Sequence, residues 1–303
     1  MNERVGLWEL DTLVRAVGQL YATADKKRTL WDVWFHTCHH TGALATELRT
    51  EPDEGAWMEE LADTCLWFLT AIDRIGRPKP KASTSGSELE AVVRISGRCS
   101  DLLWQRYAIG CPSCVREPAE TPERAPKYPA MCQCNPRFPD DAKHDQTLRP
   151  RMALLRTRAD ERRAARPDTI IEWQQYLSSV FQTLLAFPDA RRVHLGHLLL
   201  EQLGSTSDAL IRTYSYTAKK PPVLDEVRWR QTRLELELAR FLCLLFLVPS
   251  ARDKDLADII GRRYGPVEGR KLRCWACHAQ ECVCPLQIAP SDVSIEDLVS
   301  KMA

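Results

Sequence analysis

The sequence has few glycines, no long hydrophobic run and almost no net charge. Only 13 of its 303 residues are glycine, which disfavours folds built on many tight turns. The longest unbroken apolar run, residues 241–248, is too short to span a bilayer. Basic residues exceed acidic ones by one (42 against 41), so no overall field draws the chain to nucleic acid or to a membrane. The first residues, MNERVGLWELDTL, carry charges where a signal peptide needs an apolar stretch, and we therefore expect a soluble cytoplasmic protein.

The sequence has enough apolar residues to form a core, and these residues recur with the spacing of helices. Apolar residues make up 44% of the chain and charged residues 27%, which excludes wholesale disorder. Apolar side chains recur three and four positions apart nearly throughout, and this spacing predicts an all-α fold. The expected helices cover 10–21, 31–48, 61–75 and 89–107 in the first half, and 169–187, 191–216, 227–248 and 253–263 in the second.

Eight of the twelve cysteines form two tight groups with the spacing of metal ligands. In an intracellular chain, CxxC and CxC pairs indicate a structural zinc site more than disulfides, with an iron–sulfur cluster as the alternative. We therefore expect two zinc ions, one held by Cys111, Cys114, Cys132 and Cys134 and the other by Cys274, Cys277, Cys282 and Cys284. The remaining four, expected to be small buried apolar residues, are Cys38, Cys65, Cys99 and Cys243.

The two halves share landmarks in the same order, which indicates an internal duplication. QRY (105–107) precedes the first cysteine group and RRY (262–264) precedes the second. ELAD (60–63) matches ELAR (237–240), and Gly42 matches Gly204. The expected organisation is a helical unit over 1–135 with a zinc knuckle at 111–134, a linker and basic helix over 136–166, a second unit over 167–290 with a knuckle at 274–284, and a C-terminal tail over 291–303.

The helix pair HHTGALATELR (39–49) and EELADTCLWFL (59–69) resembles the MazG-like all-α nucleoside triphosphate pyrophosphohydrolases. In that family an ExxE pair on one helix and an ExxD pair on the next hold Mg²⁺, which binds the triphosphate and activates water. The resemblance implies two MazG-like units forming a pseudo-dimeric bundle. It also implies cleavage of a nucleoside triphosphate to a monophosphate and pyrophosphate, with Glu60 and Asp63 as the remaining ExxD pair and with Glu47 and His40 on the preceding helix.

The chain departs from this pattern at most of the metal-binding positions. His40 and Ala43 occupy the ExxE positions of the first copy, and Gln202 and Ser205 those of the second. Glu237 is kept in the second copy, but Arg240 replaces the aspartate and places a cation where a cation should bind. Because one carboxylate pair holds Mg²⁺ poorly against hydration, we expect low or absent Mg²⁺-dependent turnover, and a bound Mg²⁺ or Mn²⁺ is possible but not favoured.

Three alternatives remain open at the level of single residues. His36 and His40, four residues apart, could join Glu60 and Asp63 around Zn²⁺ or Mn²⁺, or these side chains could be packed or solvated. The arginines of 151–166 could face an acidic partner, although a solvated helix face is the expected outcome. An aromatic set could stack on a nucleobase, although a place in the core is favoured; it comprises Trp31, Trp34, Phe35, Trp57, Trp67 and Trp104.

The function expected from this sequence is a nucleotide-binding MazG-like protein with impaired or lost hydrolysis, acting as a nucleotide sensor or an interaction subunit. The first alternative is an active pyrophosphohydrolase with an altered metal site in the first copy. The second is a zinc-knuckle protein that binds nucleic acid, which the near-zero net charge disfavours. Expected partners are a nucleotide and either another protein or a second copy of the chain, but not a membrane.

Overall fold

The computed structural model describes residues 4–26, 28–50, 54–77, 98–111, 152, 155–186, 188–215, 224–266, 270–282 and 284. Within these residues the chain is helical, and the only β pairing is an isolated bridge between Glu9 and Thr169. The predicted all-α fold class is therefore confirmed. In the same part of the chain, no helix combines the length and the apolar character needed to cross a membrane.

The helices follow the same order in each half of the chain. Helices α1 and α8 both have eleven residues, α2 and α9 both have four, and α6 and α12 both have nine. The two longest helices of each half stand at matching places in this order. The first half contains η1 (Val5–Leu7), α1 (Leu10–Leu20), α2 (Ala22–Asp25), α3 (Leu30–Thr50), α4 (Glu54–Gly76) and α6 (Cys99–Tyr107); the second contains η3 (Arg163–Ala165), α8 (Ile170–Val180), α9 (Gln182–Leu185), α10 (Pro188–Tyr214), α11 (Leu224–Ser250) and α12 (Leu256–Tyr264).

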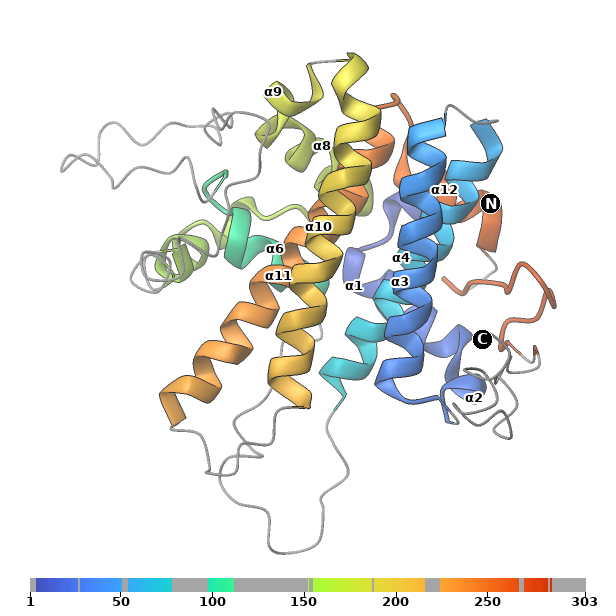
Figure 1. Cartoon of the computed structure of the whole chain (residues 1–303), viewed down its shortest axis with the longest axis horizontal. Coiled ribbons are helices and arrows are strands. Elements are labelled where there is room, and N and C mark those ends of the chain that lie inside the picture. Colours follow the sequence, from blue (N-terminus) through green and yellow to red (C-terminus); the bar gives the residue numbers. More distant parts are fainter. Residues whose placement is uncertain are drawn as a thin grey trace, which may run out of the picture.

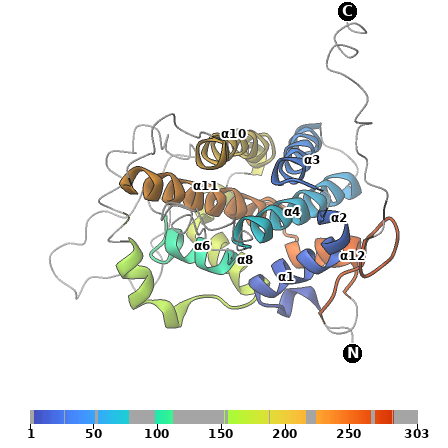
Figure 2. The ribbon, with the colours of Figure 1, turned by 90° about the horizontal axis from the view of Figure 1, so that it is seen from below.

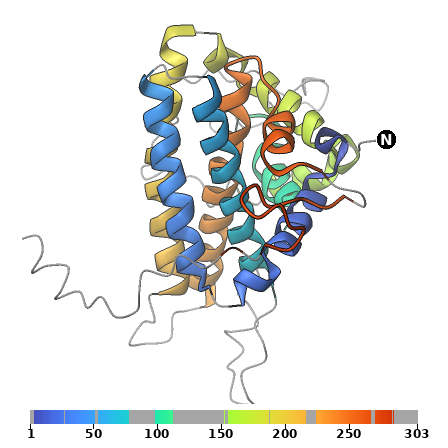
Figure 3. The same ribbon diagram turned by 90° about the vertical axis from the view of Figure 1, so that its right-hand side faces the viewer.

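The long helices form two layers, and shorter helices form a third. Helices α3 and α10 lie side by side over α4 and α11, while α1, α6, α8 and α12 cover the opposite face (Figures 1 and 2). The last short helix of each half packs on the long helix of the other half, α12 on α4 and α6 on α11. The side view of the layers shows the same arrangement (Figure 3).

One hydrophobic core joins the two halves. It contains the eight-residue apolar run of α11, each of whose side chains is no more than 3% exposed. The rings of Trp34 (α3), Phe68 (α4) and Phe241 (α11) contact one another, with 4.9 Å between the centroids of Phe68 and Phe241. Gly196 allows α10 to approach α3 closely, because a Cβ there would lie 3.2 Å from the carbonyl oxygen of Ala45. The predicted division of the chain at 136–166 stays a prediction, and residues 136–151 lie outside the described part of the chain.

Most of the aromatic and cysteine residues that were expected in the core lie there. Cys65, Cys99 and Cys243 are buried, and Cys38 is half-buried against the core. Four of the six predicted aromatic residues are buried (Trp34, Trp57, Trp67 and Trp104), Trp31 is partly buried, and Phe35 is 68% exposed.

The basic segment 155–166 docks on the protein itself. Arg162 donates to the carbonyl oxygen of Ala108 (2.7 Å), and Arg166 pairs with Asp101 (2.7 Å). Arg156 lies 3.8 Å from Glu235. These contacts give several of the arginines an intramolecular role, between α6 and α11.

Candidate functional site

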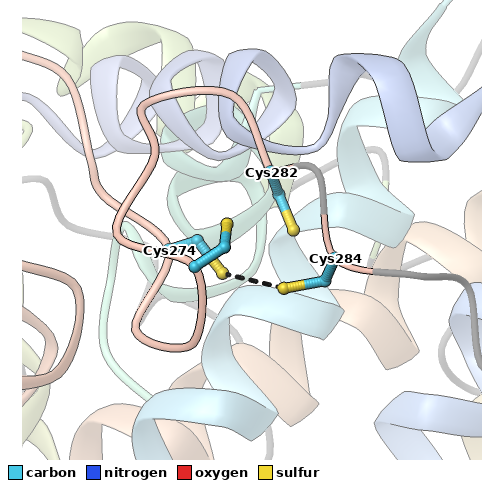
Figure 4. Close-up of side chains that lie close together, drawn as sticks. Cys274, Cys282 and Cys284 are labelled. Atoms are coloured by element: carbon cyan, nitrogen blue, oxygen red, sulfur yellow. Dashed lines mark hydrogen bonds between the residues drawn. The ribbon is translucent and has the colours of Figure 1, made fainter.

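Four cysteines converge just after α12. The sulfur atoms of Cys274, Cys277, Cys282 and Cys284 all lie within 4.8 Å of one another. Cys274 Sγ and Cys284 Sγ are 3.8 Å apart, and Figure 4 shows the labelled sulfurs directed toward one point. A tetrahedron with Zn–S bonds of ~2.3 Å has edges of about 3.8 Å, so the donor set fits a four-coordinate metal ion such as zinc. Four thiolates leave no open position, which is typical of a structural site.

The backbone around these cysteines is tightly turned. The amide of His278 donates to the carbonyl of Cys274 (2.8 Å), and the amide of Cys274 donates to the carbonyl of Ala279 (2.9 Å). His278 adopts a left-handed conformation (φ 56°) that closes the turn. Its side chain is exposed and does not belong to the cysteine group.

Hydrogen bonds attach the knuckle to the end of α12 and to the segment at the end of α1. The amide of Arg273 donates to the carbonyl of Tyr264 at the end of α12 (2.8 Å). The amide of Cys282 donates to the carbonyl of Leu20 at the end of α1 (2.7 Å), and Thr23 donates to Glu281. The knuckle therefore links the C-terminal helix of the second half to the first helix of the chain.

Burial raises the pKa of the Cys284 thiol, and it raises that of Cys282 far above the ordinary range. Because a metal binds the thiolate form, these protons must leave when an ion enters the site. Metal affinity should therefore increase with pH.

The predicted first knuckle lies almost wholly outside the described residues. Cys111, which follows α6, is buried against the core. Cys114, Cys132 and Cys134 are not among the residues that the structure describes, and neither is the predicted tail 291–303. The first zinc site stays a prediction.

The second candidate site is the acidic pair on α4, where Asp63 is held by two residues of α12. Arg263 makes two contacts with the carboxylate, Nε to Oδ1 (2.9 Å) and Nη2 to Oδ2 (2.8 Å). Tyr264 donates its hydroxyl to Oδ1 (2.6 Å), and Arg263 Nη1 also donates to Glu59 (2.6 Å). The Asp63 side chain is only 6% exposed, so both of its oxygens are buried and occupied.

Burial acts on the two partners of Asp63 in different ways. It raises the pKa of Tyr264 well above its usual value, so the phenol keeps the proton that it donates. Burial alone would lower the pKa of Arg263, but the hydrogen bond and charge of Asp63, and then Glu59, raise it overall. The guanidinium therefore stays charged beside the carboxylate.

Glu60, the other member of the pair, is held by a residue of α3. His40 Nδ1 lies 2.9 Å from Glu60 Oε2. The matching position in the second half repeats the contact, since Gln202 Nε2 donates to Glu237 Oε2 (2.6 Å). In both halves, a polar residue of one long helix contacts a glutamate of the next long helix.

The other predicted members of this site, His36 and Glu47, do not form a metal-binding group with the acidic pair. His36 stacks on Trp67 with 4.2 Å between ring centroids, and burial followed by the charge of Arg28 lowers the pKa of His36. Glu47 lies two turns beyond His40 on α3. Among the described residues, the four cysteines are the only group of three or more metal-binding side chains close enough to share an ion.

In the second half, the position of Asp63 is taken by the buried Arg240. Burial, followed by the nearby Cys243, raises the pKa of Tyr107 well above its usual value, although the charges of Arg106 and Arg240 lower it. Tyr107 matches Tyr264 in the repeat, where the phenol faces a carboxylate. The second half therefore has a buried arginine at the position where the first half has a buried aspartate.

The partners of Asp63 were missed in the sequence, although a signal for them was present. Arg263 and Tyr264 belong to the RRY landmark that marks the repeat, and the landmark alone does not indicate which carboxylate it meets. No protein-family model, curated protein or solved structure matches the chain. Only the geometry of the two sites therefore bears on function.

Proposed function

We propose that this chain is a MazG-like helical protein that does not hydrolyse nucleoside triphosphates and acts as a nucleotide-sensing or interaction subunit. The observation that carries the proposal is that both carboxylate oxygens of Asp63 accept hydrogen bonds from Arg263 and Tyr264. In the family that the sequence resembles, these oxygens would be ligands of Mg²⁺. Here an arginine of the same chain supplies the positive charge.

The energetics of metal binding favour the internal arrangement. Mg²⁺ loses its water reluctantly and needs several oxygen ligands in octahedral geometry. To reach Asp63 it would have to displace a charged, two-point arginine contact, which is among the stronger hydrogen-bonded pairs in proteins. Glu60 is contacted by His40, and Ala43 offers no ligand, so little remains to offset that loss.

The two halves are proposed to be fused copies that form a pseudo-dimer. Three observations support this: the repeated order of helices, the equal lengths of the short helices, and the exchange of α6 and α12 between the halves. In a homodimer such an exchange would join two subunits. In one chain, it places Arg263 of the second copy against Asp63 of the first.

Zinc is the proposed metal of Cys274, Cys277, Cys282 and Cys284, with a second ion at the first cysteine group. Zinc fits the thiolate set and the tight CxxC and CxC turns. Its proposed role is structural, because it would hold α12 and the end of α1 together through the knuckle.

The experiment that tests the proposed function measures pyrophosphate release from a panel of ribo- and deoxyribonucleoside triphosphates with Mg²⁺ or Mn²⁺. We expect no release above the protein-free rate, from the wild type or from Asp63→Asn. Release by the wild type that Asp63→Asn abolishes would show an active enzyme and contradict the proposal.

The same nucleotides distinguish the two roles of a subunit that does not hydrolyse them. A ligand that binds the folded state raises the midpoint of thermal unfolding as its concentration increases. Such a rise without hydrolysis supports the sensing role. No rise with any nucleotide assigns the chain to the interaction role.

A further inference from the structure

Trp275 is unusual among the tryptophans of this protein. All nine lie in the described part of the chain, and Trp275 is the only one that is exposed, at 49%. It stands between Cys274 and Cys277, in the turn closed by the hydrogen bond from His278 to Cys274. The indole is therefore presented to solvent on a short turn whose ends are cysteines of the candidate metal site.

The side chain of Arg263 lies against the indole of Trp275 and orients it. The guanidinium carbon of Arg263 lies 4.3 Å from the ring centroid of Trp275. Arg263 is itself held by Asp63 and Glu59 on α4, so the ring rests on an anchored support. A ring held in this way loses little freedom when another flat molecule stacks on it.

The surface around Trp275 is basic, although the whole chain is nearly neutral. Residues 262–273 contain five basic side chains and one acidic one, and one of the five, Arg263, is paired with Asp63 and Glu59 on α4. Four of the five are exposed: Arg262, Arg270, Lys271 and Arg273. The hydrogen bond from Arg273 to Tyr264 brings 270–273 alongside the end of α12, next to the turn that carries Trp275 (Figure 3).

Described carboxylates also contact this region. Glu59 accepts from Arg263, and Glu281, next to Cys282, accepts from Thr23. Arg270, Lys271 and Arg273 are three exposed basic side chains within four residues.

We propose that this basic knuckle binds single-stranded nucleic acid, with a base stacked on Trp275 and phosphates beside Arg270, Lys271 and Arg273. An exposed aromatic ring in a positively charged surface is the combination that single strands require, because each base offers a flat face and each linkage a negative charge. A duplex hides its base faces, so the same surface binds a duplex less tightly. The near-zero net charge of the whole chain disfavours nucleic-acid binding on average. It does not describe the charge of a single segment such as 270–273.

Fluorescence anisotropy with the zinc-loaded full chain tests the proposal, using a labelled oligouridylate and oligothymidylate of about twelve nucleotides and a duplex of equal length. The expected result is binding to the single strands and markedly weaker binding to the duplex. Trp275→Ala should weaken the binding about tenfold, while Trp275→Phe, which keeps a stacking ring, should retain most of it. Phe35→Ala is the matched control, because Phe35 is an exposed aromatic residue on α3, away from the knuckle.

A salt series tests the phosphate contacts. The slope of log affinity against log salt should fall by about 2 in the triple variant Arg270→Gln, Lys271→Gln, Arg273→Gln, because each single-strand phosphate contact contributes ~0.7. The triple variant Arg156→Gln, Arg158→Gln, Arg163→Gln removes the same charge elsewhere and should leave the slope unchanged.

Several outcomes would overturn the proposal. In the anisotropy experiment, these are a wild type that does not bind the single strands, equal affinity for the duplex, and unchanged affinity of Trp275→Ala. In the salt series, the contradicting result is an equal slope of log affinity against log salt for the two triple variants. Zinc analysis accompanies each variant. If Trp275→Ala has lost its metal, the decision passes to Trp275→Phe, and a tenfold loss there despite full zinc content would exclude stacking.

Discussion

At the scale of single residues, the decisive feature is a carboxylate that the chain itself has neutralised. Asp63 is nearly buried, and a buried charge is tolerated only with a partner and with its hydrogen bonds satisfied. Arg263 and Tyr264 supply both, at distances between 2.6 and 2.9 Å. Asp63 is therefore a point where α12 is attached to α4.

Removing Arg263 should therefore destabilise the protein far more than removing its neighbour. Arg263→Ala leaves a buried, unpaired carboxylate, and we expect a loss of about 3 kcal/mol in the free energy of unfolding. Arg262→Ala, on the exposed side of the same helix, should change it by less than ~0.5 kcal/mol. Urea denaturation of both variants measures the difference.

The double variant Asp63→Asn, Arg263→Ala provides the control for this prediction. It removes the charge as well as its partner, so it should be less destabilised than the sum of the two single variants. Additive effects would show that Asp63 and Arg263 do not act on each other.

At the scale of elements, α1 and α8 occupy matching places but begin differently. Their first turns meet at the bridge between Glu9 and Thr169, where the amide of Ile170 donates to the carbonyl of Trp8 (3.0 Å). Thr169 and Glu172 form a capping box at the start of α8, whereas Glu9 makes no side-chain cap on α1. The same local fold is thus stabilised by a cap in only one half.

The loss of this cap should be measurable. Thr169→Ala should lower the free energy of unfolding by about 1 kcal/mol, because it leaves an amide of the first turn of α8 without its acceptor. Glu9→Ala removes a side chain that does not cap α1, and a change below ~0.5 kcal/mol is expected. Thermal or chemical unfolding of the pair provides the comparison, and equal losses would show that the capping box contributes nothing of its own.

At the scale of the whole molecule, the knuckle connects parts of the chain that are far apart in sequence. It joins the end of α12 to the end of α1, and Arg263 connects the same region to α4. The exchange of α6 and α12 ties the halves together in a second way. The metal site is therefore expected to stabilise the whole fold and not the knuckle alone.

Metal removal tests this expectation. Elemental analysis should find two zinc ions per chain, and Cys277→Ser should lower the content by one. A strong chelator should lower the midpoint of thermal unfolding by several degrees, because a folded-state ligand is lost. A content of one zinc would contradict the predicted first site, and an unchanged midpoint would contradict the structural role of the metal.

Local patterns in the sequence were sufficient to predict the helices and the second cysteine group. Helical spacing and the CxxC and CxC turns involve residues within a few positions of one another, so the chain carries them without reference to its tertiary fold. The repeat also indicated that α6 and α12 would match. It could not indicate that each would pack on the other half.

The contacts of the acidic pair and the exposure of Trp275 were decided by tertiary structure alone. Arg263 meets Asp63 across 200 positions of sequence, and only the packing of α12 on α4 brings them together. Eight tryptophans are buried or partly buried, whereas Trp275 lies on an exposed turn. Periodicity and ligand spacing are local properties, whereas burial and long-range pairing arise from how complete helices pack.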